Sequence, residues 1–328
     1  MSFVCFVVKT LCPRWWRLYC VLLMRPKILI VLGPTAVGKS EVALHLAKRV
    51  NGEIINADSQ QVYRLMDIGT GKPSKAERER VRHHLIDIVA PNEEFNAALF
   101  RRLATESIRQ IHARGRNVIV CGGTGLYLKA LTRGLFEGPG QDPEVRQALE
   151  HEIAANGLAS LYQRLEKIDP TVGSSIHPND RQRIVRALEV YQLTGRPLST
   201  WQKEHAFQED PFDLLKVGLL REREELYGLI NHRSEQMIQQ GLLDEVRGLV
   251  ARGFDLDLKP LRSVGYRQMG QVLRGTKSMN HAVEEMKQET RHLAKRQLTW
   301  FRRDDEIRWF HPEGQSKEIE LMVAKFLS

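Results

Sequence analysis

The 328-residue sequence predicts an α/β fold, in which a parallel β-sheet carries a phosphate-binding loop and a helical segment interrupts the sheet domain. Three observations predict it. Short apolar, β-branched runs alternate with helical patterns between residues 27 and 121. A glycine-containing loop follows the first of these runs. Strand character returns at residues 214–220 after a long helical stretch, which indicates an insertion into one core domain.

The phosphate-binding loop directly follows the first predicted strand, residues 27–32, and precedes a predicted helix at residues 41–50. It matches the pattern G-x-x-x-x-G-K-S. Backbone N–H groups and the helix dipole of such a loop bind phosphate, Lys39 adds a positive charge, and the Ser40 hydroxyl can hold Mg²⁺. The core is therefore predicted to be P-loop NTPase-like. The loop consists of Gly33, Pro34, Thr35, Ala36, Val37, Gly38, Lys39 and Ser40.

A second predicted strand, residues 53–58, ends in Asp58-Ser59-Gln60-Gln61. Ligands of an open parallel sheet bind beyond the carboxyl ends of its strands. These four residues, which we call the tetrad, are therefore expected beside the phosphate-binding loop.

The next elements follow the same alternation: a strand at residues 83–89, a helix at 96–114 and a strand at 117–121. The last strand leads into a glycine-rich segment around Thr124, which places one hydroxyl at a carboxyl end. P-loop ATPases often carry an acidic residue that organises Mg²⁺. This strand end has none, which counts against plain ATP hydrolysis.

Residues 134–140 are rich in glycine and proline and indicate a boundary, after which residues 141–201 have a helical pattern. Asn179 or Asp180 is expected to cap a helix that ends near Gly195. Gln182 and Arg186 lie opposite the apolar face of this helix. Its basic face fits either a solvated surface or a nucleic-acid contact.

Beyond the predicted strand at 214–220, a helical pattern runs to Leu243, and a long helix is expected at 281–303. Residues 262–267 form a basic loop or helix start. Residues 299–303 combine aromatic side chains with arginines, a combination that suits RNA. A core helix with a solvated basic edge remains the alternative.

The composition bounds the function. A net charge of +9 and a pI near 9.4 favour a polyanionic partner, although a basic enzyme without one also fits. Three of the four cysteines fall in the first twenty residues, without the spacing of a zinc site. A disulfide framework is not expected in so long a chain, which predicts a reducing, cytoplasmic location. No run approaches the roughly 20 apolar residues of a membrane helix, and no membrane role is expected.

The predicted organisation has four parts. Residues 1–23 are an extension outside the fold, with Met24 as the preferred start; a membrane-surface anchor is the less favoured alternative. Residues 24–137 form the first part of the P-loop core. Residues 138–205 form a helical insertion. Residues 206–328 complete the core and include the basic helix near the C-terminus.

Five motifs together resemble the bacterial tRNA dimethylallyltransferases, in order and with compatible spacing between Lys27 and Arg303. Residues 1–23 fall outside the resemblance. The resemblance implies transfer of a dimethylallyl group from dimethylallyl diphosphate to N6 of the adenosine on the 3′ side of the anticodon. The motifs are residues 33–40, 58–63, 122–127, 262–267 and 295–302.

The resemblance also implies roles for single residues. Asp58 is the candidate base, and Thr124 would orient the amine or the diphosphate. The loop at 33–40 would hold the diphosphate. Charge and position, and not the resemblance, suggest help from Arg223, with Arg221 and Arg233 as further candidates. Ser40 would bind Mg²⁺, and the enzyme is expected to act as a monomer.

A flipped adenosine is required, because the reacting base is otherwise stacked within its loop. The implied tRNA contacts fall in the tetrad, the insertion and the C-terminal part of the core. They are Asp58, Ser59, Gln60, Gln61, Thr124, Arg146, Gln182, Arg183, Ile184, Val185, Arg186, Arg262, Ser263, Val264, Gly265, Tyr266, Arg267, Lys295, Arg296, Gln297, Leu298, Thr299, Trp300, Phe301 and Arg302.

Three alternatives remain open from the sequence. A P-loop kinase would turn over ATP, but the missing acidic residue and the basic insertion speak against it. An isopentenyltransferase for free adenine nucleotides shares the core motifs, but does not need the insertion or the basic helix. A non-catalytic RNA-binding protein with a vestigial loop is disfavoured by the intact loop beside Asp58 and Thr124.

Overall fold

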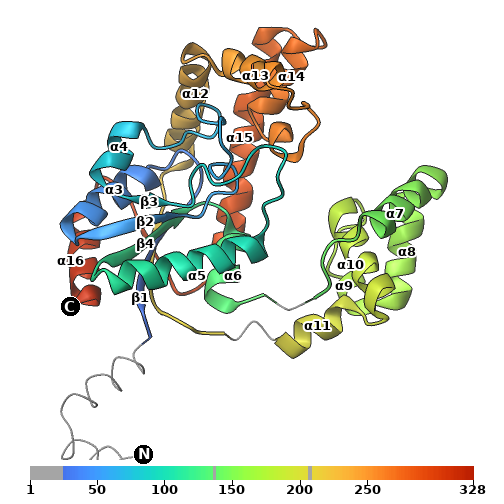
Figure 1. The fold of residues 1–328 in the computed structure, drawn as a ribbon, viewed down its shortest axis with the longest axis horizontal. Coiled ribbons are helices and arrows are strands. Elements are labelled where there is room, and N and C mark those ends of the chain that lie inside the picture. Colours follow the sequence, from blue (N-terminus) through green and yellow to red (C-terminus); the bar gives the residue numbers. More distant parts are fainter. Residues whose placement is uncertain (1–24, 136–137, 206–208) are drawn as a thin grey trace, which may run out of the picture. The chain divides into compact units, whose positions relative to one another are not determined.

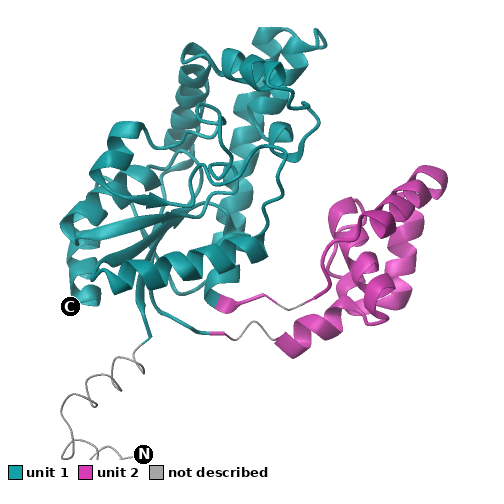
Figure 2. Ribbon diagram, viewed as in Figure 1, with its two compact units in different colours: residues 1–132, 210–328 teal, residues 133–209 magenta. Residues whose placement is uncertain are grey.

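The computed structural model describes residues 25–135, 138–205 and 209–328, so the predicted extension 1–23 and Met24 lie outside the described residues. The described chain divides into two compact units (Figure 2). Residues 25–132 and 210–328 form unit 1, and Arg133–Glu209 form unit 2. Unit 2 takes in the segment 138–205 that the sequence predicts as the insertion.

Unit 1 is built on a six-stranded sheet in the order β3-β2-β4-β1-β5-β6, with every pair parallel (Figure 1). β1 lies in the middle, between β4 and β5, and the strand order reverses there. A ligand site is expected beyond the carboxyl end of such a strand. The strands are β1 (Lys27–Leu32), β2 (Gly52–Asn56), β3 (His83–His84), β4 (Asn117–Gly122), β5 (Asp213–Leu219) and β6 (Ile307–Phe310).

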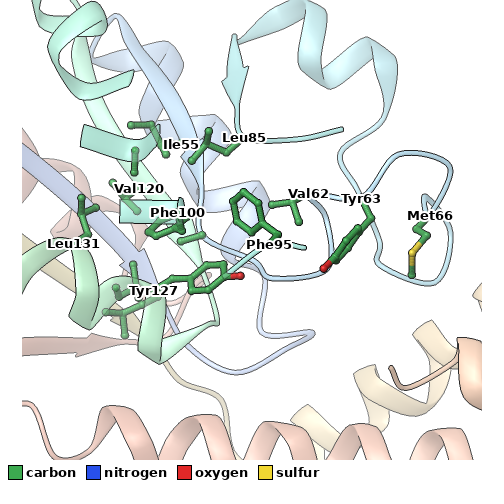
Figure 3. Packing of buried hydrophobic residues seen from close by; sticks show 14 of the residues in the cluster. Ile55, Val62, Tyr63, Met66, Leu85, Phe95, Phe100, Val120, Tyr127 and Leu131 are labelled. Carbon is green, nitrogen blue, oxygen red and sulfur yellow. The ribbon is translucent and has the colours of Figure 1, made fainter. Parts of the chain in front are cut away.

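Helices cover both faces of the sheet. Successive side chains of a strand point to opposite faces, so a strand that is apolar throughout has an apolar side chain to bury on each face. Ile28 and Ile30 of β1 pack in one core with α5 and α6, whereas Leu29 and Val31 pack in a second core with α3 and α16. Figure 3 shows the first core, where the rings of Phe100 and Tyr127 stack with centroids 4.6 Å apart. Both faces of the central strands are therefore buried.

The unit 1 helices fall before and after unit 2 in the chain. They are α3 (Lys39–Arg49), α4 (Lys75–Arg80), α5 (Ala97–Ala113), α6 (Gly125–Arg133, whose last residue belongs to unit 2), α12 (Arg223–Gln239), α13 (Leu242–Ala251), the 3₁₀ helix η1 (Lys259–Arg262), α14 (Tyr266–Leu273), α15 (Met279–Phe301) and α16 (Ser316–Leu327).

Unit 2 has its own core, in which Leu149, Leu161 and Ile184 are almost fully buried. Asp180 caps its third long helix and Gly195, with a φ of 69°, ends it, as the sequence predicts. The described residues include no helix long and apolar enough to cross a membrane. The helices are α7 (Pro143–Asn156), α8 (Leu158–Ile168), α9 (Pro170–Gly173), α10 (Arg181–Thr194) and α11 (Leu198–His205).

Most predicted elements of unit 1 are confirmed within a few residues, but the predicted strand at 83–89 is wrong. Only His83 and His84 pair with β2. Leu85 and Asp87 have φ values of 60° and 56°, which turn the chain out of the strand conformation. The helical pattern that runs to Leu243 is two helices, α12 and α13, separated at Gly241. β6 and α16 are two further elements that the sequence pattern does not predict.

Candidate active site

The phosphate-binding loop connects β1 to α3 at the centre of the sheet. Gly33 has a φ of 147°, and a Cβ on it would lie 2.6 Å from the backbone oxygen of Leu219 at the end of β5. Glycine at this position therefore lets the loop run against the neighbouring strand end. Gly38 is also left-handed and precedes the first residue of α3, Lys39. The local structure is that of an anion site at a helix N-terminus.

Lys39 is a half-buried cation inside this loop. Its ammonium group donates a hydrogen bond of 2.6 Å to the backbone oxygen of Pro34. The pKa of Lys39 falls to about 8, chiefly because of burial and to a smaller extent because of Arg233, although Cys121 and Asp58 act in the opposite direction. At neutral pH the group is thus charged but poorly compensated, which favours an anionic ligand.

A cavity of about 90 Å³ opens beside the loop. Its polar lining includes Lys39, Ser40, Asp58, Arg233 and Gln297. The cations Lys39 and Arg233, the carboxylate of Asp58 and three hydroxyl side chains, including Ser40, thus line the same space. The arrangement suits a phosphate or diphosphate together with a group that must give up a proton.

A second cavity, of about 110 Å³, also has Asp58 and Arg233 in its lining. The larger part of its lining surface is apolar, although Ser234, Ser263 and Thr290 line it as well. The apolar side chains include Ile230, Met237, Val264, Met286 and Leu293. Gln60 lines it too, and its buried side-chain oxygen has no hydrogen-bond partner in the described chain. We call the two cavities together the donor site, with one polar and one apolar half that meet at Asp58 and Arg233.

The tetrad lies at the carboxyl end of β2 and is held by its own backbone. Asp58 accepts a hydrogen bond of 2.8 Å from the backbone N–H of Gln60. The hydroxyl oxygen of Thr124 accepts one of 3.0 Å from the backbone N–H of Ser59. Thr124 is not part of the lining of either cavity. The structure therefore brings Thr124 to the tetrad, whose backbone it orients.

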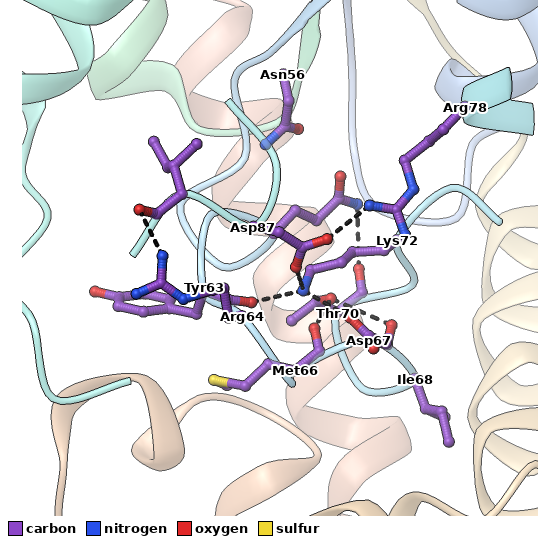
Figure 4. A network of polar contacts seen from close by, with 12 residues as sticks. Asn56, Tyr63, Arg64, Met66, Asp67, Ile68, Thr70, Lys72, Arg78 and Asp87 are labelled. Atoms are coloured by element: carbon purple, nitrogen blue, oxygen red, sulfur yellow. Dashed lines mark hydrogen bonds and ion pairs between the residues drawn. The ribbon is translucent and has the colours of Figure 1, made fainter. Parts of the chain in front are cut away.

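The loop after the tetrad is fixed by a polar network around Lys72 (Figure 4). The Lys72 ammonium donates to the backbone oxygen of Tyr63 at 2.6 Å, to Asp67 at 2.7 Å and to Asp87. Arg78 donates to the other oxygen of Asp87 at 2.6 Å. Burial raises the pKa of Asp87, but the hydrogen bonds from Lys72 and Arg78 outweigh it and the pKa falls. The chain leaves the strand conformation at Asp87 because this side chain pairs with both Lys72 and Arg78.

Of the candidate diphosphate arginines, the structure brings Arg233 to the donor site and not Arg223. Arg223 is exposed at the start of α12, with its guanidinium 5.2 Å from the ring centre of Tyr227. Arg221 is engaged by Glu225 and Glu313. Burial lowers the pKa of Arg233, which Asp58 partly offsets. The sequence feature that could have favoured Arg233 is its place between the apolar positions Ile230 and Met237.

Several residues predicted to contact RNA are buried, so they do not form part of an exposed RNA-binding surface. The tetrad residue Gln61, whose amide donates to Thr70 and Gly71, is 9% exposed. The other buried members of the predicted set are Ile184, Val185, Gly265, Tyr266 and Phe301. Exposed members are Gln182, Arg183, Arg262, Lys295, Arg296, Thr299, Trp300 and Arg302.

Arg146 and Arg186, both predicted to contact RNA, share a buried carboxylate in unit 2. Glu189 is fully buried and accepts hydrogen bonds from Arg146 at 2.7 and 3.1 Å and from Arg186 at 2.6 Å. Arg186 also donates to the backbone oxygens of Pro139 and Gly140. Burial raises the pKa of Glu189, but the two arginines outweigh it and lower that pKa. The group joins α10 to the segment before α7.

The described residues contain no cluster of three or more histidine, cysteine or acidic side chains placed to hold a metal ion. Ser40 and Asp58 nevertheless offer oxygen ligands in one cavity with the cations Lys39 and Arg233. Mg²⁺ usually binds through one or two protein oxygens, water and substrate phosphate. The residues present fit a Mg²⁺ ion that arrives with a diphosphate.

Comparisons with known proteins agree on one family. The model of the IPP transferase family matches residues 61–304. The chain is 51% identical over 302 residues to a tRNA dimethylallyltransferase of Geobacter metallireducens, covering 92% of this chain and 98% of that protein. It is 53% identical over 283 residues to one of Syntrophobacter fumaroxidans, covering 86% and 83%.

Two solved structures are similar to this one. A tRNA isopentenylpyrophosphate transferase from Bacillus halodurans matches with a TM-score of 0.69 and 40% identity, over 92% of this chain and 97% of that one. A eukaryotic dimethylallyltransferase acting on tRNA matches with a TM-score of 0.79 and 28% identity, over 92% and 79%.

Proposed function

This chain belongs to the IPP transferase family, and from that membership we propose how it carries out its reaction, the transfer of a dimethylallyl group to tRNA. The donor is dimethylallyl diphosphate and the acceptor is N6 of the adenosine on the 3′ side of the anticodon. One observation carries the proposal: Asp58 and Arg233 line both halves of the donor site. Proton acceptor, leaving-group cation and apolar pocket thus meet at one point.

The donor fits the two halves in one orientation. Its diphosphate would occupy the polar half, against the loop at 33–40, Lys39 and Arg233. Its five-carbon chain would occupy the apolar half, between Met237 and Met286. The carbon that carries the diphosphate then lies near Asp58.

The reaction forms one bond and breaks one. The lone pair of N6 bonds to the first carbon of the dimethylallyl group, and the diphosphate leaves with the electrons of the carbon–oxygen bond. Lys39 and Arg233 neutralise the charge that develops on the leaving group. When bound, Mg²⁺ held by Ser40 would add a further positive charge beside the diphosphate.

The amine must lose a proton once carbon is bonded to it. It is then acidic, so an ordinary carboxylate suffices, and Asp58 takes the proton. General-base catalysis contributes about 10²–10⁴-fold. The unpartnered side-chain oxygen of Gln60 can accept the second N6 hydrogen, which favours an amine over a carbonyl at that position.

The tRNA would bind the exposed cations of both units. Arg183 of α10 and Lys295 and Arg296 of α15 supply them. Gln182 adds an exposed amide, and Trp300, which is 39% exposed, offers a ring for base stacking. The adenosine must be flipped out to reach Asp58. Because one chain supplies the whole donor site, we propose a monomer, which acts in the cytoplasm where tRNA is found.

A transfer assay tests the proposal. The purified chain is incubated with Mg²⁺, labelled dimethylallyl diphosphate and unmodified tRNA, with AMP and ATP as rival acceptors. We expect label in tRNA alone. Label in AMP or ATP would establish a free-nucleotide enzyme, and ATP consumption without label in any acceptor would establish a kinase.

A further inference from the structure

Gln297 lies on the predicted RNA-binding helix α15, but its side chain reaches two loops of the donor site. Its carbonyl oxygen accepts a hydrogen bond of 2.8 Å from the backbone N–H of Thr35 in the phosphate-binding loop. Its amide nitrogen donates one of 2.9 Å to the backbone oxygen of Gly123, in the segment that carries Thr124. One carboxamide thus contacts two distant segments: Gly123 precedes Gln297 by 174 positions in the chain, and Thr35 precedes it by 262.

The approach of this side chain depends on a glycine. A Cβ on residue 123 would lie 2.4 Å from the amide nitrogen of Gln297 and 3.4 Å from the backbone oxygen of Gly33. The segment at 123 is therefore packed against both Gln297 and the phosphate-binding loop. A side chain there would push Gln297 out of place.

Both partners of Gln297 are backbone groups, so the bridge depends on the chemistry of residue 297 alone. A carboxamide offers an acceptor and a donor side by side at any pH near neutrality. Glutamate would keep the bond from Thr35 but would place an oxygen against the oxygen of Gly123. Alanine would lose both bonds.

Neighbouring side chains of α15 behave differently. Lys295, Arg296, Thr299 and Trp300 are exposed, whereas Gln297 is half-buried and lines the polar half of the donor site with Lys39 and Asp58. The helix thus presents one surface to solvent and Gln297 to the donor site.

We infer that Gln297 is a positioning residue for the donor site and not an RNA contact, an inference that rests on the proposed function. It holds the phosphate-binding loop and the segment at 123–124 at a fixed separation. Through Gly123 and Thr124, this also fixes the tetrad, because Thr124 holds the backbone of Ser59.

Direct binding of inorganic diphosphate with Mg²⁺, measured by calorimetry without RNA, tests the inference. The variants are Gln297→Ala and Gln297→Glu, with Arg296→Ala as the matched change on the same helix. We expect Gln297→Ala to raise the Kd of diphosphate about 10-fold, as the loss of two hydrogen bonds would. Its KM for tRNA should stay within about 2-fold of wild type, whereas Arg296→Ala should raise that KM and leave the diphosphate Kd unchanged.

The reverse pattern would overturn the inference: wild-type diphosphate binding by Gln297→Ala together with a raised KM for tRNA. If Gln297→Ala does not fold, Gln297→Glu carries the test, because it keeps the bond from Thr35 and loses only the one to Gly123. Wild-type diphosphate binding by that variant would equally overturn the role. The calorimetric measurement needs no transfer, so a failure of the proposed reaction would remain distinguishable from a failure of this inference.

Discussion

The two units hold their arginines and lysines in opposite ways. In unit 1, Lys39 and Arg233 are half-buried and line one cavity with Asp58, and neither forms an ion pair within 4 Å among the described residues. In unit 2, Arg146 and Arg186 share the buried carboxylate of Glu189. The uncompensated pair marks a place for an anionic ligand, whereas the compensated pair marks a structural joint. A cluster of cations does not by itself identify a binding site. What identifies it is that the cations lack carboxylate partners within the protein.

The largest effect should come from Lys39, which has no such partner. Lys39→Met should reduce transfer by about 1,000-fold, because a buried donor to the leaving group is lost. The free energy of unfolding should change by no more than about 1 kcal/mol, since burial already opposes the charge. Steady-state kinetics and urea unfolding measure the two.

Lys72 is the matched control, because its side chain is buried but its ammonium is paired with Asp67 and Asp87. Lys72→Met should cost at least about 2 kcal/mol of stability by leaving Asp87 short of a partner. An equal loss of stability in both variants would break the distinction between ligand cations and structural cations.

The second-largest effect is expected for Glu189, the carboxylate that pairs with the arginines of unit 2. Glu189→Ala should lower the stability of unit 2 by about 3 kcal/mol, because Arg146 and Arg186 are left partly buried without a carboxylate. Hydrogen exchange should show faster opening of α10 but not of the central strands. Diphosphate binding should be unchanged. Unchanged protection in α10 would mean that the group is not a structural joint.

Asp58 should come third. Asp58→Ala should slow transfer at least about 100-fold while tRNA affinity stays within a few-fold, because the base is lost and the RNA surface is not. Asp58→Asn preserves the acceptor for the backbone of Gln60 and should be almost as slow. A near-normal rate in either variant would remove Asp58 from the role of base.

The lowered pKa of Lys39 predicts a pH dependence. In the free enzyme the ammonium form dominates below about pH 8 and is lost as the pH rises through that value. The affinity for diphosphate should therefore fall about tenfold per pH unit above 8. Lys39→Arg, whose guanidinium keeps its charge, should show no such fall. A flat profile in the wild-type enzyme would contradict the assigned pKa.

The smallest effect compares two arginines of α10. Arg183 is exposed and forms only a surface ion pair with Asp180, whereas Arg186 is held by Glu189. Arg183→Ala should reduce the salt slope of tRNA binding by about 1, and Arg186→Ala should leave it unchanged. The sequence alone predicts an RNA contact for Arg186, so an equal reduction in both variants would restore that prediction.

The parts of the site that depend on local pattern could be predicted from the sequence. The strand before Gly33 and the helix after it follow from periodicity, and the tetrad follows from the position of Asp58 at a strand end. Tertiary contacts decided the rest. The run after His83 alternates like a strand, but Asp87 must meet Lys72 and Arg78 and the chain turns away.

Single residues within motifs were the least predictable. A motif spans residues of different burial, so the pattern around Gln182 includes Ile184, which belongs to the core of unit 2. Arg223 and Arg233 have the same chemistry, and only the path of α12 decides which one reaches the donor site. Gln297 carries no signal of its partners, because both are backbone groups distant in the chain.

The pairing of β1 with both β4 and β5 also has a consequence for the order in which the chain folds during synthesis. Unit 2 is contiguous and complete once residue 209 has emerged, whereas β1 pairs with β5 residue by residue, as in Leu29 with Leu215. Until the later segment emerges, β1 is the open edge of an unfinished sheet, and such edges promote aggregation. We therefore expect nascent chains that end near residue 209 to hold a protease-resistant unit 2 beside a sheet that still needs protection, a state that limited proteolysis of stalled chains can detect.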